Sequence, residues 1–327
     1  MNKNILGLAV TAALAVPMTA TAGQAEMEQT LRSLEAQVSA LKAEMASMKS
    51  SQMASGGAEW TEKVSFNGLV EFDYIDPDNA DGDFELSTME LGVQTQLSDM
   101  VSSGMILKSE NGNDLFIDEL TVTLAGDDMP AAFTVGKFGA PFGAYETHMI
   151  ADPLTKGDGD TGSLRAVMVN TAMGGVDVSL YTGSGDTNRS NDVSGIALGM
   201  EQGDLALGAG WIDNVTAESG SSAWTANVGY SMGDISLIGE YLDIDNTADT
   251  TVLNVEMGYN FVVSGKEATV ALGYGNKEET ATADVTQTAG IFSMGIAEGT
   301  TAAVEFLNSD TGATDVDMMT ARIAYEF

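Results

Sequence analysis

Apolar and polar residues alternate with a period of two along most of this chain, from about residue 63 to the last residue. In the final segment Thr320, Arg322 and Glu326 lie between the apolar positions, which are Met319, Ala321, Ile323, Tyr325 and Phe327. Successive side chains of a β-strand point to opposite faces, so this pattern predicts a strand with one apolar and one polar face.

The same rhythm recurs often enough to predict about 16 strands, an even number. One position breaks it: Asp118 falls on the apolar face of its strand, which indicates a β-bulge or a shifted register. The predicted strands are 63–74, 90–97, 101–109, 114–125, 131–139, 163–171, 175–182, 193–201, 204–213, 222–232, 234–244, 250–263, 266–276, 285–296, 299–308 and 315–327.

The connections between these strands alternate in length. Short joints such as Ser264-Gly265 alternate with longer, polar and acidic ones such as 76–83, 183–192 and 276–284. A transmembrane antiparallel β-barrel has short turns at one rim and long loops at the other. A soluble β-sandwich gives no reason for so regular an alternation. The sequence therefore predicts an all-β transmembrane barrel.

Composition agrees with a membrane barrel. After residue 22 no segment is apolar over the roughly 20 residues of a membrane helix. The chain has 37 Gly and 5 Pro residues and no Cys, and its mean hydropathy is near zero. Lipid-facing and lumen-facing residues of a barrel strand cancel in such an average. The absence of Cys excludes a disulfide-stapled scaffold.

The N-terminal region predicts three further segments. Residues 1–22 have the charge, apolar run and small-residue cleavage site of an export signal, and residues 51–62 have the composition of a linker. Residues 23–50 predict a short α-helical coiled coil, because apolar residues recur at spacings of four and three. Its seam is Met27, Leu31, Leu34, Val38, Leu41, Met45 and Met48. So short a coil needs partner chains, which a homotrimer of barrels would supply; a lone amphipathic helix is the alternative.

The remaining residues, 63–327, form the predicted barrel. Its closing strand ends on Phe327, and this ending is similar to the assembly signal of Gram-negative outer-membrane barrels. An export signal together with this ending predicts that the chain is located in the bacterial outer membrane, in contact with its lipid.

The net charge is strongly negative. It is −35 for the whole chain, and removal of Lys3 with the signal makes it −36. Nucleic acid is excluded as a partner, because phosphate binding needs a basic surface. Such acidity fits a mouth that attracts cations, and it equally fits a soluble, salt-adapted surface.

The longest connection, residues 139–162, is more apolar than the other loops. Long loops in a compact fold usually carry function. We expect this loop either to fold into the barrel and narrow it, or to form a surface or trimer contact.

Residues 115–160 resemble the siderophore porins of the LbtU type. The resemblance rests on residues 117–124 (IDELTVTL), 135–143 (VGKFGAPFG) and 145–155 (YETHMIADPLT). The N-terminal coiled coil also matches that group. The resemblance implies an outer-membrane barrel associated with the uptake of ferric siderophores. Residues 23–62 are too few and too helical for a plug domain, so we expect no energised receptor.

Charged residues near the long loop and on the predicted polar faces are the pore candidates. Opposed acidic and basic groups across a constriction create a field that orients polar solutes. The alternative is that each charge pairs locally and only satisfies the wall. The candidates are Glu71, Glu90, Lys108, Glu119, Lys137, Glu146, His148, Asp152, Lys156, Arg165 and Arg322.

Catalysis and metal binding are not expected. His148 is the only histidine, and no second ligand lies at a spacing that makes a zinc site. No serine beside it forms a nucleophile–base pair, so an outer-membrane hydrolase is a poor interpretation. The acidic loops do not match the spacing of a calcium-binding EF-hand. We therefore expect no enzyme activity, no cofactor and no metal site.

The function that these features predict is passive transport. The leading hypothesis is a porin that passes small hydrophilic solutes, with a ferric siderophore as the specific solute. A general cation-preferring diffusion porin is the alternative within transport. A closed structural or adhesive barrel is the alternative from another class.

Overall fold

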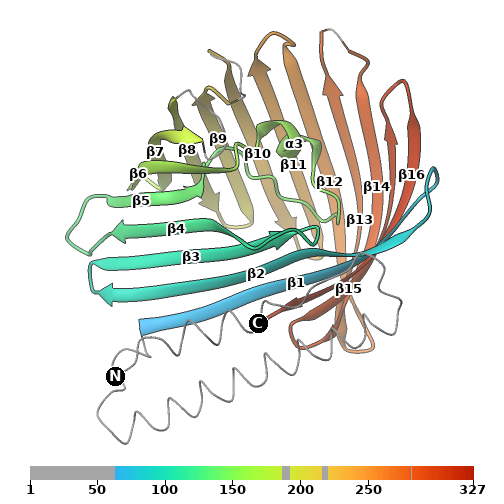
Figure 1. Cartoon of the computed structure of the whole chain (residues 1–327), viewed down its shortest axis with the longest axis horizontal. Coiled ribbons are helices and arrows are strands. Elements are labelled where there is room, and N and C mark those ends of the chain that lie inside the picture. The colour runs from blue at the N-terminus through green and yellow to red at the C-terminus, as the bar shows by residue number, and fades with distance from the viewer. Residues whose placement is uncertain (1–62, 186–191, 216–219, 281) are drawn as a thin grey trace, which may run out of the picture. The chain divides into compact units, whose positions relative to one another are not determined.

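A computed structural model describes residues 63–185, 192–215, 220–280 and 282–327. Within them sixteen antiparallel strands close into a barrel (Figure 1), which confirms the predicted all-β barrel and its strand count. The predicted signal, coiled coil and linker (1–62) lie outside the described residues. None of the described helical residues forms a segment long and apolar enough to cross a membrane.

The elements are β1 (Val64–Pro77), β2 (Asp83–Ser98), β3 (Val101–Glu110), β4 (Phe116–Leu124), β5 (Ala132–Gly139), α3 (Leu154–Gly159), β6 (Ser163–Met173), β7 (Val176–Gly185), β8 (Asp192–Gln202), β9 (Leu205–Asp213), β10 (Ser222–Met232), β11 (Ile235–Asp245), β12 (Thr250–Val263), β13 (Lys266–Glu278), β14 (Val285–Ala297), β15 (Thr300–Asp310) and β16 (Asp315–Glu326). Each strand pairs with the next, and β16 pairs with β1 to close the ring.

The short turns have the geometry that their residues favour. Between β12 and β13, Ser264 and Gly265 have φ angles of 53° and 81°. Two consecutive positive φ angles define the type I′ turn, whose twist matches that of antiparallel strands. The predicted short joint at this position is therefore a tight hairpin turn.

The outer face of the barrel is apolar. Leu272 on β13 is 65% exposed and Phe306 on β15 is 62% exposed, although both lie in the middle of paired strands. Large apolar side chains left in this position need an apolar solvent, which the bilayer core provides for a barrel. On both strands the residues that alternate with these point inward, as a period of two predicts.

The irregularity predicted at Asp118 is a β-bulge. On β3, Ile106 lies opposite Glu119 and Leu107 lies opposite Ile117, so Asp118 has no partner across the ladder. The extra residue restores the alternation on its C-terminal side, because Glu119 then takes the inner face and Leu120, 47% exposed, the outer.

A glycine sets the close approach of β4 and β5. Gly136 has a φ angle of 152°, and a Cβ atom there would lie 2.0 Å from the carbonyl oxygen of Leu120. No side chain fits that space, which explains the glycine in the 135–143 segment.

One half of the barrel interior holds an apolar core. The core consists of side chains from β5 to β12 together with residues of the 140–162 loop. Its buried members are Phe138, Phe142, Leu164, Ala166, Tyr181, Val193, Ile212, Val215, Ala223, Leu242, Ile244 and Val252. The loop thus packs against the inner wall as a helix packs on a sheet in a globular protein.

Candidate pore and constriction loop

The 140–162 loop enters the barrel, which decides between the two predicted placements in favour of the inward one. Its entry is fixed by Phe142, which is 1% exposed and lies over Gly210 on the inner face of β9. Figure 1 shows α3 and the chain around it inside the curve of the strands. The helix contacts β11, β12 and β13.

Three buried carboxylates hold the descending part of the loop, Ala144 to Ala151, by its backbone. We call Glu240, Glu256 and Glu305 the anchoring carboxylates; they lie on β11, β12 and β15 and are 5%, 6% and 1% exposed. A backbone N–H cannot be left unpaired in the interior, and a carboxylate accepts several such bonds at once. The loop is therefore bound at successive points along the wall.

Glu240 receives four hydrogen bonds. The backbone N–H groups of Ala144 and Tyr145 donate to it at 2.8 and 3.1 Å, and the hydroxyls of Thr155 and Thr225 donate at 2.9 and 3.2 Å. Its donors come from both the descending part of the loop and α3. This carboxylate therefore ties the two parts of the loop to one strand.

Glu256 and Glu305 hold the rest of the descending part. Glu256 accepts from the Thr147 hydroxyl and the His148 N–H, both at 2.6 Å. Glu305 accepts from the N–H groups of Ile150 and Ala151, at 2.6 and 3.2 Å. The tip of the loop thus reaches β15.

A row of glycines on the inner wall makes room for the loop side chains. A Cβ atom on Gly258 would lie 2.8 Å from Nε2 of His148, and one on Gly273 would lie 3.1 Å from Cε of Met149. A Cβ atom on Gly275 would lie 3.0 Å from Leu154. Because β-strand interiors disfavour glycine, this row marks the surface on which the loop docks.

Tyr145 fills the space between the two parts of the loop. It has a φ angle of 51°, and its ring lies where Cβ atoms on Gly143 or Gly159 would have to be. Burial raises the pKa of the Tyr145 phenol well above its ordinary value, and the nearby carboxylates of Glu240 and Asp160 add to the shift. The phenol stays neutral and acts as a packing group.

The wall formed by β16, β1, β2 and β3 contributes no residue to the apolar core and carries charged side chains. Arg322 on β16 donates to Asp73 through Nε and Nη2 at 2.8 and 2.7 Å, and to Glu71 at 2.7 Å. Asp73 is 3% exposed and also accepts from the Ser87 hydroxyl at 2.6 Å. This cluster fastens β1 to β16 where the barrel closes.

A second charged cluster lies two strands further on. Lys108 on β3 pairs with Glu90 at 3.2 Å and with Glu110 at 2.7 Å. Its charged partners remain 29% and 50% exposed. Glu119, on the inner side of β4, accepts a hydrogen bond from the Gly139 N–H at 3.2 Å.

The structure places the sequence-predicted residues in three groups. Glu71, Glu90, Lys108, Glu119 and Arg322 lie on the inner wall. The loop carries Glu146, Asp152, His148 and Lys156. Lys137 and Arg165 lie on the outer face.

The loop residues differ in their surroundings. Glu146 is exposed, and Asp152 is exposed but pairs with Lys156 at 2.8 Å. His148 contacts the Ser236 hydroxyl through Nε2 at 3.0 Å. Further along, Asp158 pairs with Lys277 of β13 at 2.7 Å. The charged loop positions thus pair locally or face the lumen.

Lys137 and Arg165 do not line the pore as predicted, because both lie on the outer face. The two are register partners on β5 and β6, and they share a face with Val135 and Val167, which are 53% and 52% exposed. Period two places residues 135 and 137 on the same side of a strand. Nearness to the loop in sequence was therefore a poor guide to direction.

Sequence reasoning missed the three anchoring carboxylates. An acidic residue at the middle of a strand, on its inner side, is the signal that was available, and inner-face glycines on neighbouring strands are a second one. Among the described residues no three His, Cys, Asp or Glu side chains come together as metal ligands.

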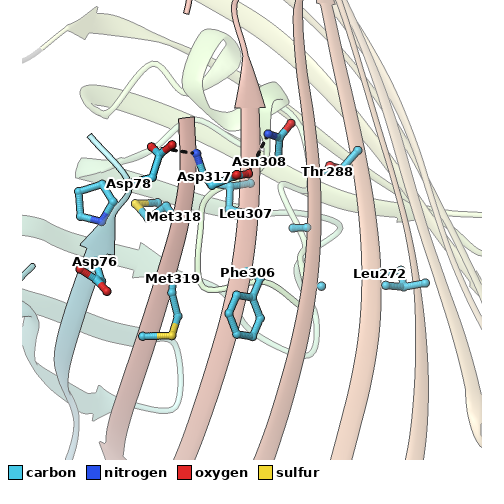
Figure 2. Close-up of a pocket in the computed structure, with 13 residues that line it drawn as sticks. Asp76, Asp78, Leu272, Thr288, Phe306, Leu307, Asn308, Asp317, Met318 and Met319 are labelled. Atoms are coloured by element: carbon cyan, nitrogen blue, oxygen red, sulfur yellow. Dashed lines mark hydrogen bonds between the residues drawn. The ribbon is translucent and has the colours of Figure 1, made fainter. Parts of the chain in front are cut away.

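One surface groove lies outside the barrel. Figure 2 shows this groove of about 650 Å³. Leu272, Phe306 and Met319 line it on the outer face, and Asp78 and Asp317 stand at its polar end, where the Asp317 N–H donates to Asp78. It is separated from the lumen by the strands and does not belong to the pore.

The sixteen-stranded barrel with its inward loop has the fold of solved outer-membrane porins. An anion-selective porin from Comamonas acidovorans has a TM-score of 0.64 and 14% identity, covering 81% of this chain and 99% of that one. The trimer form of OmpT, an outer membrane protein of Vibrio cholerae, has a TM-score of 0.62 and 14% identity, with the same coverage. Identities this low show the shared fold alone.

Sequence comparison adds less. No family model matches the chain. Two curated proteins of Legionella pneumophila, UPF0422 protein lpl2888 (strain Lens) and UPF0422 protein lpg2959 (strain Philadelphia 1), are each 25% identical to it over 194 residues. The match covers 49% of this chain and 34% of theirs. The chain thus spans about a third of the length of the curated relatives it matches.

Replacing Glu305 with alanine is expected to release the tip of the loop. The variant loses two hydrogen bonds to a charged acceptor, each worth about 1.5–3 kcal/mol. Since about 1.4 kcal/mol is a tenfold change in an equilibrium, the released state should become at least about tenfold more populated. Single-channel recording should show a larger and noisier current. A current identical to that of the parent protein would mean that the tip is held by other contacts.

Proposed function

We propose that this protein is a passive outer-membrane channel for small hydrophilic solutes. The observation that carries the proposal is the division of the lumen. The apolar core lies on the side of β5 to β12 and the loop runs from it as far as β15, whereas charged side chains line the side of β16, β1, β2 and β3. Charged groups that keep solvent exposure require water beside them. A wet path bounded by a fixed loop is what a diffusion channel needs.

The loop sets the limits of this path. It is attached to β11, β12 and β15 by the anchoring carboxylates and to β13 by the Lys277–Asp158 ion pair. A loop held at four strands keeps its position while solutes pass. Transport then needs no covalent chemistry, because the channel offers a polar route past the bilayer and the loop limits solute size.

The finer proposal concerns the solute and the assembly. The resemblance of residues 115–160 to siderophore porins supports a ferric siderophore as solute, and the sequence pattern of residues 23–50 supports a trimer joined by a coiled coil. One of the similar folds is recorded in a trimer form. A closed structural barrel is the competing function.

Electrical recording of the full-length protein in a planar bilayer tests the proposal. We expect stepwise currents, arriving in groups of three if the channel is a trimer. Ferric desferrioxamine should then reduce the current in a concentration-dependent way, whereas the iron-free form should not. A folded barrel that passes no current would exclude a diffusion channel and favour the structural alternative. An open channel indifferent to the ferric complex would exclude only the siderophore.

A further inference from the structure

Three cations on the inner wall share one arrangement: each lies between two carboxylates. We call these groups the lumen triads. They are Lys108 with Glu90 and Glu110, Lys277 with Asp158 and Glu279, and Arg322 with Glu71 and Asp73. The ion-pair distances lie between 2.7 and 3.2 Å. The triads stand on different parts of the wall, on β1 to β3, β13 and β16.

Each triad has a formal charge of −1, since one cation meets two anions. The loop contributes a fourth described cation, Lys156, which pairs with Asp152 and adds no net charge. Of the other described cations, Lys137, Arg165 and Lys266 face outward by register, and Lys63 precedes β1, so none of them changes this sum. The described inner wall therefore has no position at which positive charge exceeds negative charge.

We infer that the lumen triads make the channel selective for small cations over anions, including inorganic cations and protonated amines. The inference rests on the proposed channel function. The triads keep part of their surface in contact with solvent: the Arg322 and Lys108 side chains are 20% and 21% exposed. Fixed charge beside a water-filled path with low-dielectric walls raises the local concentration of counter-ions.

The fold itself does not set this preference. An anion-selective porin shares it with a TM-score of 0.64, so the sign of the selectivity must come from the side chains that line each lumen. In this chain each cation of a lumen triad pairs with two carboxylates, so negative charge exceeds positive charge at each triad. An anion entering the path meets no unpaired cation among the described wall residues, whereas a cation meets net negative charge at each triad.

The test is the reversal potential of the full-length protein in a planar bilayer under a potassium chloride gradient, repeated with methylammonium chloride. The reversal potential of the parent channel should have the sign that indicates cation preference in both salts. The triple variant Glu71→Gln, Glu90→Gln and Glu279→Gln makes every triad neutral without changing side-chain size. We expect its cation-to-anion permeability ratio to fall several-fold.

A control removes a carboxylate charge outside the lumen. Asp245 is exposed on β11 and has the strand parity of Leu237, which is 43% exposed on the outer face. Asp245→Asn should leave the permeability ratio unchanged. An equal effect of this control would show that total charge, and not the triads, sets selectivity.

The possible results separate the two proposals. Absence of current in the parent protein contradicts the channel itself. An open channel that prefers anions, or a triple variant with the parent's ratio, overturns the role of the triads and leaves the channel intact. Circular dichroism and the mobility of the unheated protein on a denaturing gel show that the variants are folded.

Discussion

Replacing Phe142 with alanine is expected to destabilise the barrel by about 3–5 kcal/mol, the usual cost of removing a buried aromatic ring. Phe142 is 1% exposed and joins the loop to the apolar core. The cavity left behind would lie between the loop and β9, because the ring covers Gly210. We therefore also expect the loop to shift and the conductance to rise.

The temperature at which the barrel loses its compact mobility on a denaturing gel measures the first effect, and single-channel recording measures the second. Phe306→Ala is the matched control, since it removes the same ring from the outer face, where the side chain is 62% exposed. That variant should lose less stability and keep its conductance. If both variants behaved alike, the inner core would not be what holds the loop.

Replacing Arg322 with methionine should destabilise the barrel by a similar amount, for a different reason. The variant removes the cation beside Asp73, whose carboxylate is 3% exposed. Breaking a buried ion pair from one side typically costs about 3–5 kcal/mol, because the remaining charge is left without compensation. Asp73 and Arg322 are register partners on β1 and β16, so we expect the substitution to weaken the pairing of the two strands that close the barrel.

A second substitution separates buried charge from lost packing. Adding Asp73→Asn to Arg322→Met removes the uncompensated carboxylate, and we expect the double variant to recover part of the lost thermal stability. Arg165→Met controls for the loss of an arginine. Arg165 lies on the outer face, so this substitution should have little effect on thermal stability. A double variant no more stable than the single one would contradict the explanation by buried charge.

The alternation of residues was enough to predict the barrel, because a strand between lipid and water must show it. The short turn at Ser264-Gly265 is confirmed. Of the alternatives left open by the sequence, the structure shows a bulge at Asp118 and the inward position of the long loop. The pattern predicted less well where the inner face is apolar too. On β11 the inner face includes Leu242 and Ile244 beside Glu240, since that wall packs against the loop, so alternation alone could not single out the anchoring carboxylate.

The side chains of Lys137 and Arg165 were predicted to point into the lumen, and this prediction was wrong for a related reason. Their positions next to the loop suggested a role in the lumen, but parity with Val135 and Val167 decides where a strand side chain points. The pairing of Arg322 with Asp73 joins residues 249 positions apart in the chain. Closure of the ring brings them together, and no local pattern contains that information.

The confinement of the apolar core to one side of the barrel divides the molecule into two regions with different tolerance to change. Around β5 to β12 each inner side chain fits against the loop, so most substitutions there should disturb packing, as in the core of a globular enzyme. On the other side, the inner residues apart from the buried Asp73 and its partner Arg322 face water and need only remain polar. Engineering of solute preference can therefore be confined to β1 to β4, and libraries built on those strands should retain a high proportion of folded barrels.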